Sequence, residues 1–118
     1  MKKNFVFRAI FIGSVLTFIA VLIGCGLLLP SVPSGIKAEA TSTNSVMISW
    51  NEVAGATGYK VYYGSSGNDN PVLSHTVKDT FMQHTFLISD STYYYKVAAI
   101  NNAGEGSASK IISVKTMK

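Results

Sequence analysis

The amino-acid sequence predicts an all-β fold, a β-sandwich of about seven strands, preceded by an apolar N-terminal helix. Two observations predict the sandwich. Between residues 36 and 118, short runs of alternating apolar and polar residues are separated by turn-forming residues at roughly the 8–12-residue spacing of such folds. The same span lacks the helical periodicity of an amphipathic helix. The N-terminal helix is predicted from an apolar run that ends at residue 29.

Net charge is distributed unevenly along the chain. The sequence of 118 residues and 12.7 kDa has ten basic and six acidic residues, and three of the basic ones are Lys2, Lys3 and Arg8. From residue 31 onward, seven lysines oppose the six acids, so this part is nearly neutral. A nearly neutral domain exerts little attraction on the phosphates of DNA or RNA. The sequence pI of about 9.3 therefore reflects the N-terminus, and no nucleic-acid partner is expected.

The first 29 residues have the pattern of a signal peptide or a membrane anchor. Residues 1–8 are basic, and residues 9–29 are apolar apart from a few small or polar positions. As a helix, this run of about 21 residues reaches roughly 30 Å, which is enough to span a bilayer. Residues 30–35 contain two prolines and a glycine and are expected to form a short linker. The domain itself is assigned to residues 36–118.

The single cysteine of the chain, Cys25, lies inside this apolar segment. The motif LIGC that ends at Cys25 resembles the lipobox of bacterial lipoproteins, in which the cysteine is lipidated. Residues 26–29 stay apolar, whereas lipoproteins usually become polar there, so an uncleaved transmembrane helix is the alternative. Cleavage at the AEA sequence of residues 38–40 would cut within a predicted strand. We expect attachment to a cell membrane, on its extracytoplasmic side, through a lipid on Cys25 or through the apolar helix.

The first half of the domain contains three clearly alternating strands and then a weaker one. Alternation places every second side chain on the same face of a strand. The weaker strand covers Val72–Val77 and is expected at a sheet edge. The side chains expected to point inward from the first three strands are those of Ile36, Ala38 and Ala40, then Val46, Ile48 and Trp50, then Tyr59, Val61 and Tyr63.

The second half contains three further strands. Phe81 to Leu87 is expected to form one of them, although Met82, Phe86 and Leu87 cannot all face the same way. Residues 93–99 form the next, which the turn NNAGEG at residues 101–106 ends, because asparagine and glycine tolerate tight-turn conformations. The last strand runs over residues 110–116. The inward side chains of these last two strands are those of Tyr93, Tyr95, Val97, Ala99, Ile112 and Val114.

Several separated positions together resemble the fibronectin type III family. They are Trp50, the run GYKVYY of residues 58–63, Leu87 followed six positions later by Tyr93, and the turn NNAGEG. The resemblance extends along residues 36–118 and implies a seven-stranded immunoglobulin-like sandwich. It also implies that Tyr93 is the corner tyrosine, whose hydroxyl bonds to backbone near Leu87. Ser89 departs from the family, which often has proline there, and this loosens the corner.

The resemblance implies a structural core and no particular chemistry, because this fold serves many functions. Substituting a large core aromatic such as Trp50 or Tyr93 by alanine is expected to cost roughly 3–5 kcal/mol. The core residues are Trp50, Tyr59, Val61, Leu87, Tyr93 and Val97.

Catalysis is not expected from this sequence. His75 and His84 are its two histidines, they lie on neighbouring weak strands, and nothing in their spacing predicts that they converge with an acid on a metal ion. The chain has no nucleophile elbow and no glycine-rich phosphate loop. We therefore expect no enzyme activity, no metal and no cofactor.

A binding surface is expected on the outward side of two neighbouring strands. Aromatic side chains among sparse charges are typical of contact patches, although tyrosine pairs can also serve only to stabilise an exposed sheet. The patch would bind a protein, as would the loops around Gly55 and Asn102, which makes the chain a non-catalytic protein-interaction module. The alternative is a carbohydrate-contacting accessory module at the cell surface that binds polysaccharide. The outward residues are Lys60 and Tyr62, then Tyr94 and Lys96, with Ala98 and Ile100 further along.

Overall fold

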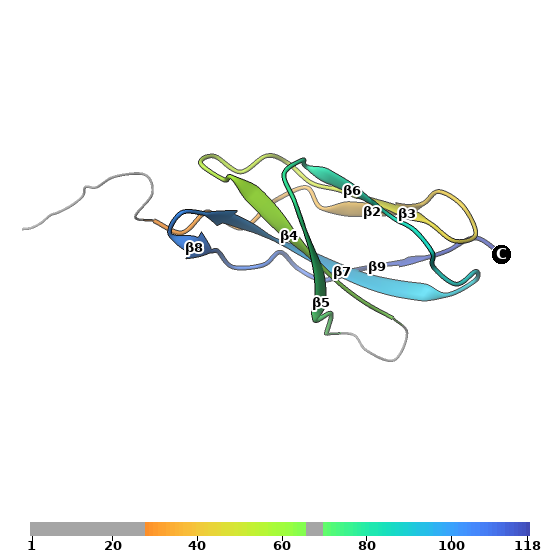
Figure 1. Ribbon diagram of the computed structural model, residues 1–118. Coiled ribbons are helices and arrows are strands. Elements are labelled where there is room, and N and C mark those ends of the chain that lie inside the picture. The colour runs from red at the N-terminus through yellow and green to blue at the C-terminus, as the bar shows by residue number, and fades with distance from the viewer. Residues whose placement is uncertain (1–27, 66–69) are drawn as a thin grey trace, which may run out of the picture.

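The computed structural model describes residues 28–65 and 70–118, which form a sandwich of two antiparallel sheets without a helix (Figure 1). The expected N-terminal helix and Cys25 lie outside the described residues. Within residues 28–65 and 70–118, no helix is long and apolar enough to cross a bilayer. The prediction of a two-sheet, all-β sandwich is confirmed.

The smaller sheet has three strands and the larger has five. In the smaller sheet, β3 (Val46–Ser49) lies between β2 (Lys37–Ala40) and β6 (Phe81–His84). The larger sheet has the order β5, β4, β7, β8, and β9 also pairs with β7. Its bounds are β4 (Gly58–Ser65), β5 (Leu73–Val77), β7 (Thr92–Asn101), β8 (Gly104–Glu105) and β9 (Ile112–Lys115). All seven predicted strands are present, β5 is at an edge as predicted, and the two-residue β8 is additional.

The core lies between the sheets and consists of side chains that alternation predicts to point inward, together with Val53 from the loop before β4. The Trp50 and Tyr59 rings meet edge to face with centroids 5.4 Å apart, and the Tyr59 hydroxyl accepts a 2.9 Å hydrogen bond from the Val53 N–H. Leu87 is half-buried against this cluster. Burial of each large side chain contributes on the order of 1.5–3 kcal/mol. The buried cluster is Val46, Ile48, Trp50, Val53, Tyr59, Val61, Tyr93, Tyr95, Val97 and Ala99.

The strand expected over Phe81–Leu87 is shorter than predicted, because β6 ends at His84. Phe86 has φ of 63°, which is the left-handed region, so the extended backbone cannot continue through it. The Leu87 N–H instead bonds to the Asn44 carbonyl at 2.9 Å. The conflict between Met82, Phe86 and Leu87 is thereby resolved: the chain leaves the sheet, the Phe86 side chain is 94% exposed, and the other two are half-buried.

The segment expected to be a linker, residues 30–35, packs against the domain. Pro30 is buried, and its carbonyl oxygen lies so close to Gly106 that a β-carbon there would come within 2.2 Å. The Ser34 carbonyl accepts a 2.9 Å hydrogen bond from the Asn51 N–H. The chain therefore joins the sandwich at a fixed place, beside β8 and the end of β7 (Figure 1). We call this end the proximal pole.

Candidate functional site

The structure brings the four predicted surface residues onto one side of the larger sheet. Tyr62 on β4 lies directly opposite Lys96 on β7, and Tyr94 is two positions further along the same strand. Lys60 is two positions from Tyr62. All four side chains are half-buried. We call this set, Lys60, Tyr62, Tyr94 and Lys96, the outer face.

Tyr62 is held by contacts within the molecule. Its hydroxyl donates a 2.5 Å hydrogen bond to Glu105 Oε2, and Lys60 Nζ lies 3.4 Å from Glu105 Oε1. The ammonium groups of Lys96 and Lys60 lie 5.3 and 5.9 Å from the centre of the Tyr62 ring. The hydrogen bond to Glu105, then burial, then the Glu105 charge raise the pKa of Tyr62 to about 12. The hydroxyl of Tyr62 is thus already engaged within the molecule.

Two other predictions for the outer face need correction or refinement. Ala98, expected to be exposed, is fully buried, because Lys60 directly opposite extends across it toward Glu105. Tyr94 lies opposite Gly64, and Gly64 is buried. A glycine leaves room on the surface of a sheet for a neighbouring aromatic ring, and Tyr94 is the residue directly opposite. The polar groups of the outer face therefore mostly contact one another and Glu105.

A second surface lies where the two sheets meet along an open edge. β5 is the edge strand of the larger sheet and β6 is an edge strand of the smaller one. Two neighbouring cavities of about 400 and 290 Å³ line this edge and share His84, Thr85 and Phe86. We call this groove the seam. Sequence reasoning did not identify it.

The seam brings together His75 and His84, for which the sequence predicts no metal site with an acid. His75 pairs with Val61, and His84 pairs with Val46; both valines are fully buried. Paired residues in antiparallel strands point to the same face, so both histidines point into the space between the sheets. Their ring centroids are 5.8 Å apart. Burial, and then the nearby charge of His75, lower the pKa of His84.

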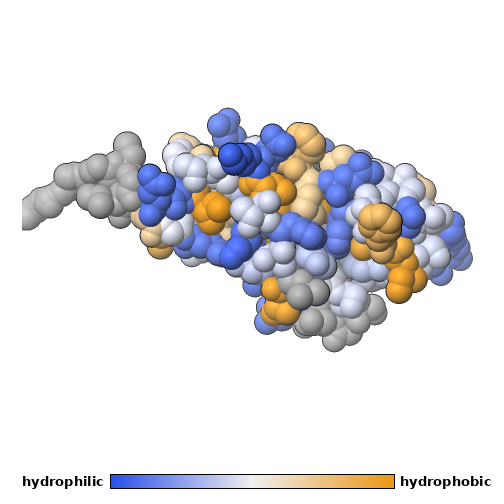
Figure 2. Space-filling view, in the orientation of Figure 1, coloured by the Kyte–Doolittle hydropathy of each residue, from blue (hydrophilic) through white to orange (hydrophobic). Residues whose placement is uncertain are grey.

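Apolar side chains are exposed at the end of the molecule opposite the proximal pole. The Phe86 and Ile88 side chains are 94% and 69% exposed. This end, the distal pole, contains the loop from Thr85 to Ser91, and Figure 2 shows apolar surface there. The ten residues of β7 separate the poles by roughly 30 Å. Sequence reasoning placed Phe86 in a strand and so missed this exposure.

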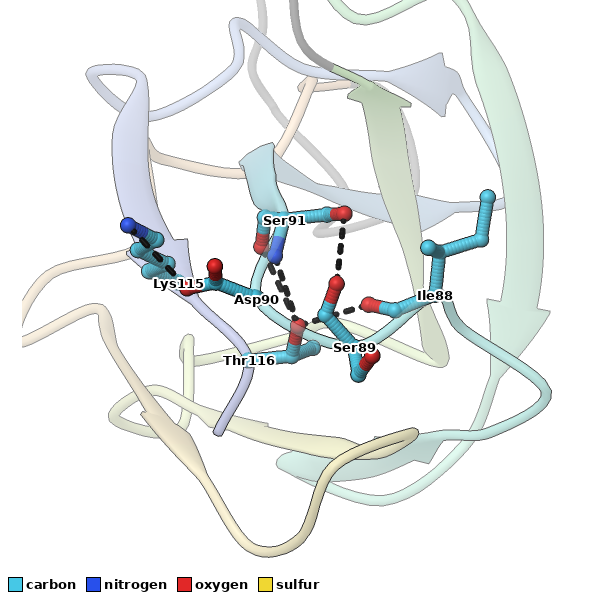
Figure 3. A network of polar contacts seen from close by, with 6 residues as sticks. All are labelled: Ile88, Ser89, Asp90, Ser91, Lys115 and Thr116. Carbon is cyan, nitrogen blue, oxygen red and sulfur yellow. Dashed lines mark hydrogen bonds and ion pairs between the residues drawn. The ribbon is translucent and has the colours of Figure 1, made fainter. Parts of the chain in front are cut away.

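The distal loop is held firmly at its base. The Tyr93 hydroxyl accepts a 2.8 Å hydrogen bond from the Ile88 N–H. Thr116 Oγ1 donates to the Ile88 carbonyl at 2.6 Å and accepts from the Ser91 N–H at 3.0 Å (Figure 3). Lys115 Nζ lies 3.2 Å from Asp90 Oδ1. These contacts strengthen the corner where Ser89 departs from the expected proline.

No group of three histidine, cysteine or acidic side chains is arranged to hold a metal ion within residues 28–65 and 70–118. The features that the described residues do offer are contact surfaces, in the seam and at the distal pole.

Comparison with known proteins identifies the fold. A family model for the fibronectin type III domain matches residues 31–115. The chain is 39% identical over 87 residues to a poly(3-hydroxybutyrate) depolymerase of Ralstonia pickettii, covering 73% of this chain and 17% of the depolymerase. It is 35% identical over 91 residues to chitinase A1 of Niallia circulans, covering 74% of this chain and 12% of the chitinase. The chain thus spans less than a fifth of these relatives.

Solved structures of fibronectin type III domains have the same fold as this chain. The FN5 domain of Drosophila Lar aligns with a TM-score of 0.63 and 27% identity, covering 76% of this chain and 99% of that one. The FN1–FN3 domains of chicken CNTN1 align with a TM-score of 0.67 and 23% identity, covering 75% of this chain and 32% of that one. Together, the sandwich, its tyrosine corner and these matches lead to one conclusion: the chain belongs to the fibronectin type III family.

Proposed function

We propose that this chain is a non-catalytic module, anchored on the extracytoplasmic side of a cell membrane, that binds a protein partner through Phe86 and Ile88. One observation carries the proposal: Phe86 is 94% exposed and has φ of 63°. This backbone conformation costs a residue with a β-carbon about 1–2 kcal/mol. An exposed ring returns little of that cost through packing. Residues in such positions cluster at functional sites.

The geometry of the proximal pole supports an outward-facing distal pole. Asn101 Nδ2 donates a 2.7 Å hydrogen bond to the Leu28 carbonyl, which ties the start of the described chain to the end of β7. With residues 1–27 at a membrane, the loops around Gly55 and Asn102 face that membrane. The distal pole then faces away from it. This arrangement favours the distal pole over those loops as the contact region for a partner.

Membrane attachment would use either a lipid on Cys25 or an uncleaved apolar helix, since both give stable anchoring. Mass spectrometry of the protein extracted from membranes separates them. An acylated N-terminal Cys25 supports the lipoprotein form, and an intact Met1 supports the helix. Recovery of a chain that begins after residue 29 in the soluble fraction would contradict both forms.

An apolar pair on a rigid loop suits a protein partner, because aromatic anchors in desolvated positions dominate such interfaces. A photo-crosslinking amino acid in place of Ile88, in the full-length chain and in intact cells, tests this contact. Lys110 is exposed outside the distal loop and provides the control position. We expect a discrete protein adduct from position 88 and none from position 110. Equal labelling from both positions would contradict the proposal.

A carbohydrate ligand is the second candidate, and the seam favours it. The 290 Å³ cavity is lined by the rings of Tyr63, His84, Phe86 and Tyr93, and flat rings of this kind stack on sugars. A chitinase is among the relatives. Retention of the full-length chain on chitin or peptidoglycan, lost with Phe86→Ser and kept with Tyr62→Ala, would support this candidate. The reverse pattern would place the ligand on the outer face.

A further inference from the structure

His75 and His84 share a cavity and leave ring nitrogens free to bind a ligand. Both line the seam cavity of about 400 Å³. His84 Nδ1 lies 2.9 Å from the Tyr95 hydroxyl, and Nε2 makes no hydrogen bond within residues 28–65 and 70–118. The His75 ring stacks on Tyr63 at 5.2 Å and 9°, a contact that uses a face of the ring. Among the described residues, no hydrogen bond is made by the nitrogens on its edge.

We propose that His75 and His84 together bind one late first-row divalent ion, Zn²⁺, Ni²⁺ or Cu²⁺, across the seam. An ion about 2.1 Å from one nitrogen of each imidazole lies roughly 3.2 Å from each ring centroid. Two ligating rings then have centroids between about 4.5 and 6.4 Å apart, as the angle at the metal opens from a right angle to a straight line. The observed separation of 5.8 Å falls within this span.

Tetrahedral coordination corresponds to a centroid separation of about 5.2 Å, which is about 0.6 Å shorter than the observed 5.8 Å. His75 is exposed on an edge strand, and its ring moves by this amount at the expense of its stacking on Tyr63. Tyr95 is fully buried and fixes the orientation of His84. With Nδ1–H donating to the Tyr95 oxygen, Nε2 presents its lone pair to the ion, as outer-shell partners of metal-binding histidines commonly arrange.

The chemistry of the site selects the class of ion. Imidazole nitrogens suit zinc, nickel and copper, whereas magnesium and calcium require oxygen ligands. Within residues 28–65 and 70–118, no acid or third histidine completes a group of three with this pair. Water in the open cavity fills the remaining positions.

Binding has a structural consequence, because the two ligands belong to different sheets. β5 and β6 do not pair with each other, so the ion would join the edges of the two sheets directly. The unfolded chain does not hold these histidines together, so the ion binds the folded state and stabilises it. The ion would therefore hold β5 and β6 together across the seam.

The test uses the full-length chain in detergent, purified without a polyhistidine tag and carrying Cys25→Ser, which removes the thiol as a competing ligand. Calorimetric titration with each of the three ions should show one site per chain and a raised melting temperature. Mg²⁺ should have no effect. His75→Gln and His84→Gln should each abolish binding, and Tyr95→Phe should weaken it about tenfold. Gln83→Ala, which changes another residue of the same cavity, should leave binding unchanged.

His75 is exposed, so the His75→Gln variant is expected to fold normally and keeps the test decisive even if His84→Gln is unstable. Ion-induced shifts of the His75 and His84 ring signals in NMR spectra would identify the ligands directly. The proposal is overturned if no ion binds below millimolar concentration. It is also overturned if folded His75→Gln binds as tightly as its parent.

Discussion

The Tyr93 hydroxyl accepts a 2.8 Å hydrogen bond from the Ile88 N–H, and this single contact connects the core to the loop that exposes Phe86. The Tyr93 ring is buried between the sheets, whereas the Ile88 side chain is exposed. A residue that stabilises the fold therefore also positions the surface that we propose for partner binding.

Removing the Tyr93 hydroxyl should loosen the distal loop. Tyr93→Phe leaves the Ile88 N–H without its partner, and we expect a loss of about 1–2 kcal/mol in the free energy of unfolding. Amide hydrogen exchange at Ile88 should accelerate. Tyr94→Phe is the matched control, because among the described residues the Tyr94 hydroxyl makes no hydrogen bond. The free energy of unfolding of this variant should stay within about 0.5 kcal/mol of the parent value. Equal effects of the two variants would argue against the corner contact.

Replacing Phe86 by glycine should stabilise the protein or leave its stability unchanged. Glycine adopts φ of 63° without strain, and the 94% exposed ring loses almost no packing. Glycine also gives the unfolded chain more conformational entropy, which offsets part of this gain. The free energy of unfolding should therefore rise by up to about 1 kcal/mol, as measured by denaturant unfolding. Thr85→Gly, at the exposed neighbouring position, should instead cost about 0.5–1 kcal/mol. A large loss of stability in Phe86→Gly would show that the ring supports the fold.

Glu105 should control the ionisation of Tyr62. The pKa of Tyr62 is about 12, raised from 10.0, so Glu105→Gln should move it back toward 10.0. Because the folded state holds this proton more tightly than the unfolded state, the contribution to stability is complete below pH 10 and is lost as pH rises through 12. Tyrosinate absorbance, with Tyr62→Phe to assign the transition, measures the shift. An unchanged titration in Glu105→Gln would contradict the network described for the outer face.

Truncating the central tryptophan should destabilise the sandwich strongly. Trp50→Ala should lower the free energy of unfolding by about 3–5 kcal/mol, since it opens a cavity beside Tyr59. Trp50→Phe should cost clearly less, because Trp50 Nε1 has no hydrogen-bond partner among the described residues. Thermal or denaturant unfolding of both variants provides the measurement. A Trp50→Ala protein as stable as its parent would be incompatible with this core.

Alternation in the sequence was sufficient to predict most of the fold. It placed Tyr93, Tyr95, Val97 and Ala99 on one side of a strand, and the structure buries all four. Alternation failed for Phe81–Leu87, because Phe86 adopts the left-handed conformation. Phenylalanine rarely does so, and the residue type therefore gave no indication that the strand ends there.

The candidate sites depend on contacts that sequence spacing does not report. Glu105 reaches Tyr62 only because β8 folds back beside β7, which brings residues 43 positions apart within hydrogen-bond distance. His75 and His84 meet because their strands lie at adjacent edges of different sheets. One usable signal was present: each histidine is two positions from an inward apolar residue, Val77 or Met82, and so shares its face.

We propose that Phe86 contacts the protein partner directly. The most direct measurement is the yield of protein adduct from a photo-crosslinker at position 88, in intact cells, compared between the natural chain and Phe86→Gly. We expect the adduct to be largely lost while the Phe86→Gly protein stays folded and present at normal levels. An undiminished adduct in a folded Phe86→Gly protein would show that Phe86 makes no such contact.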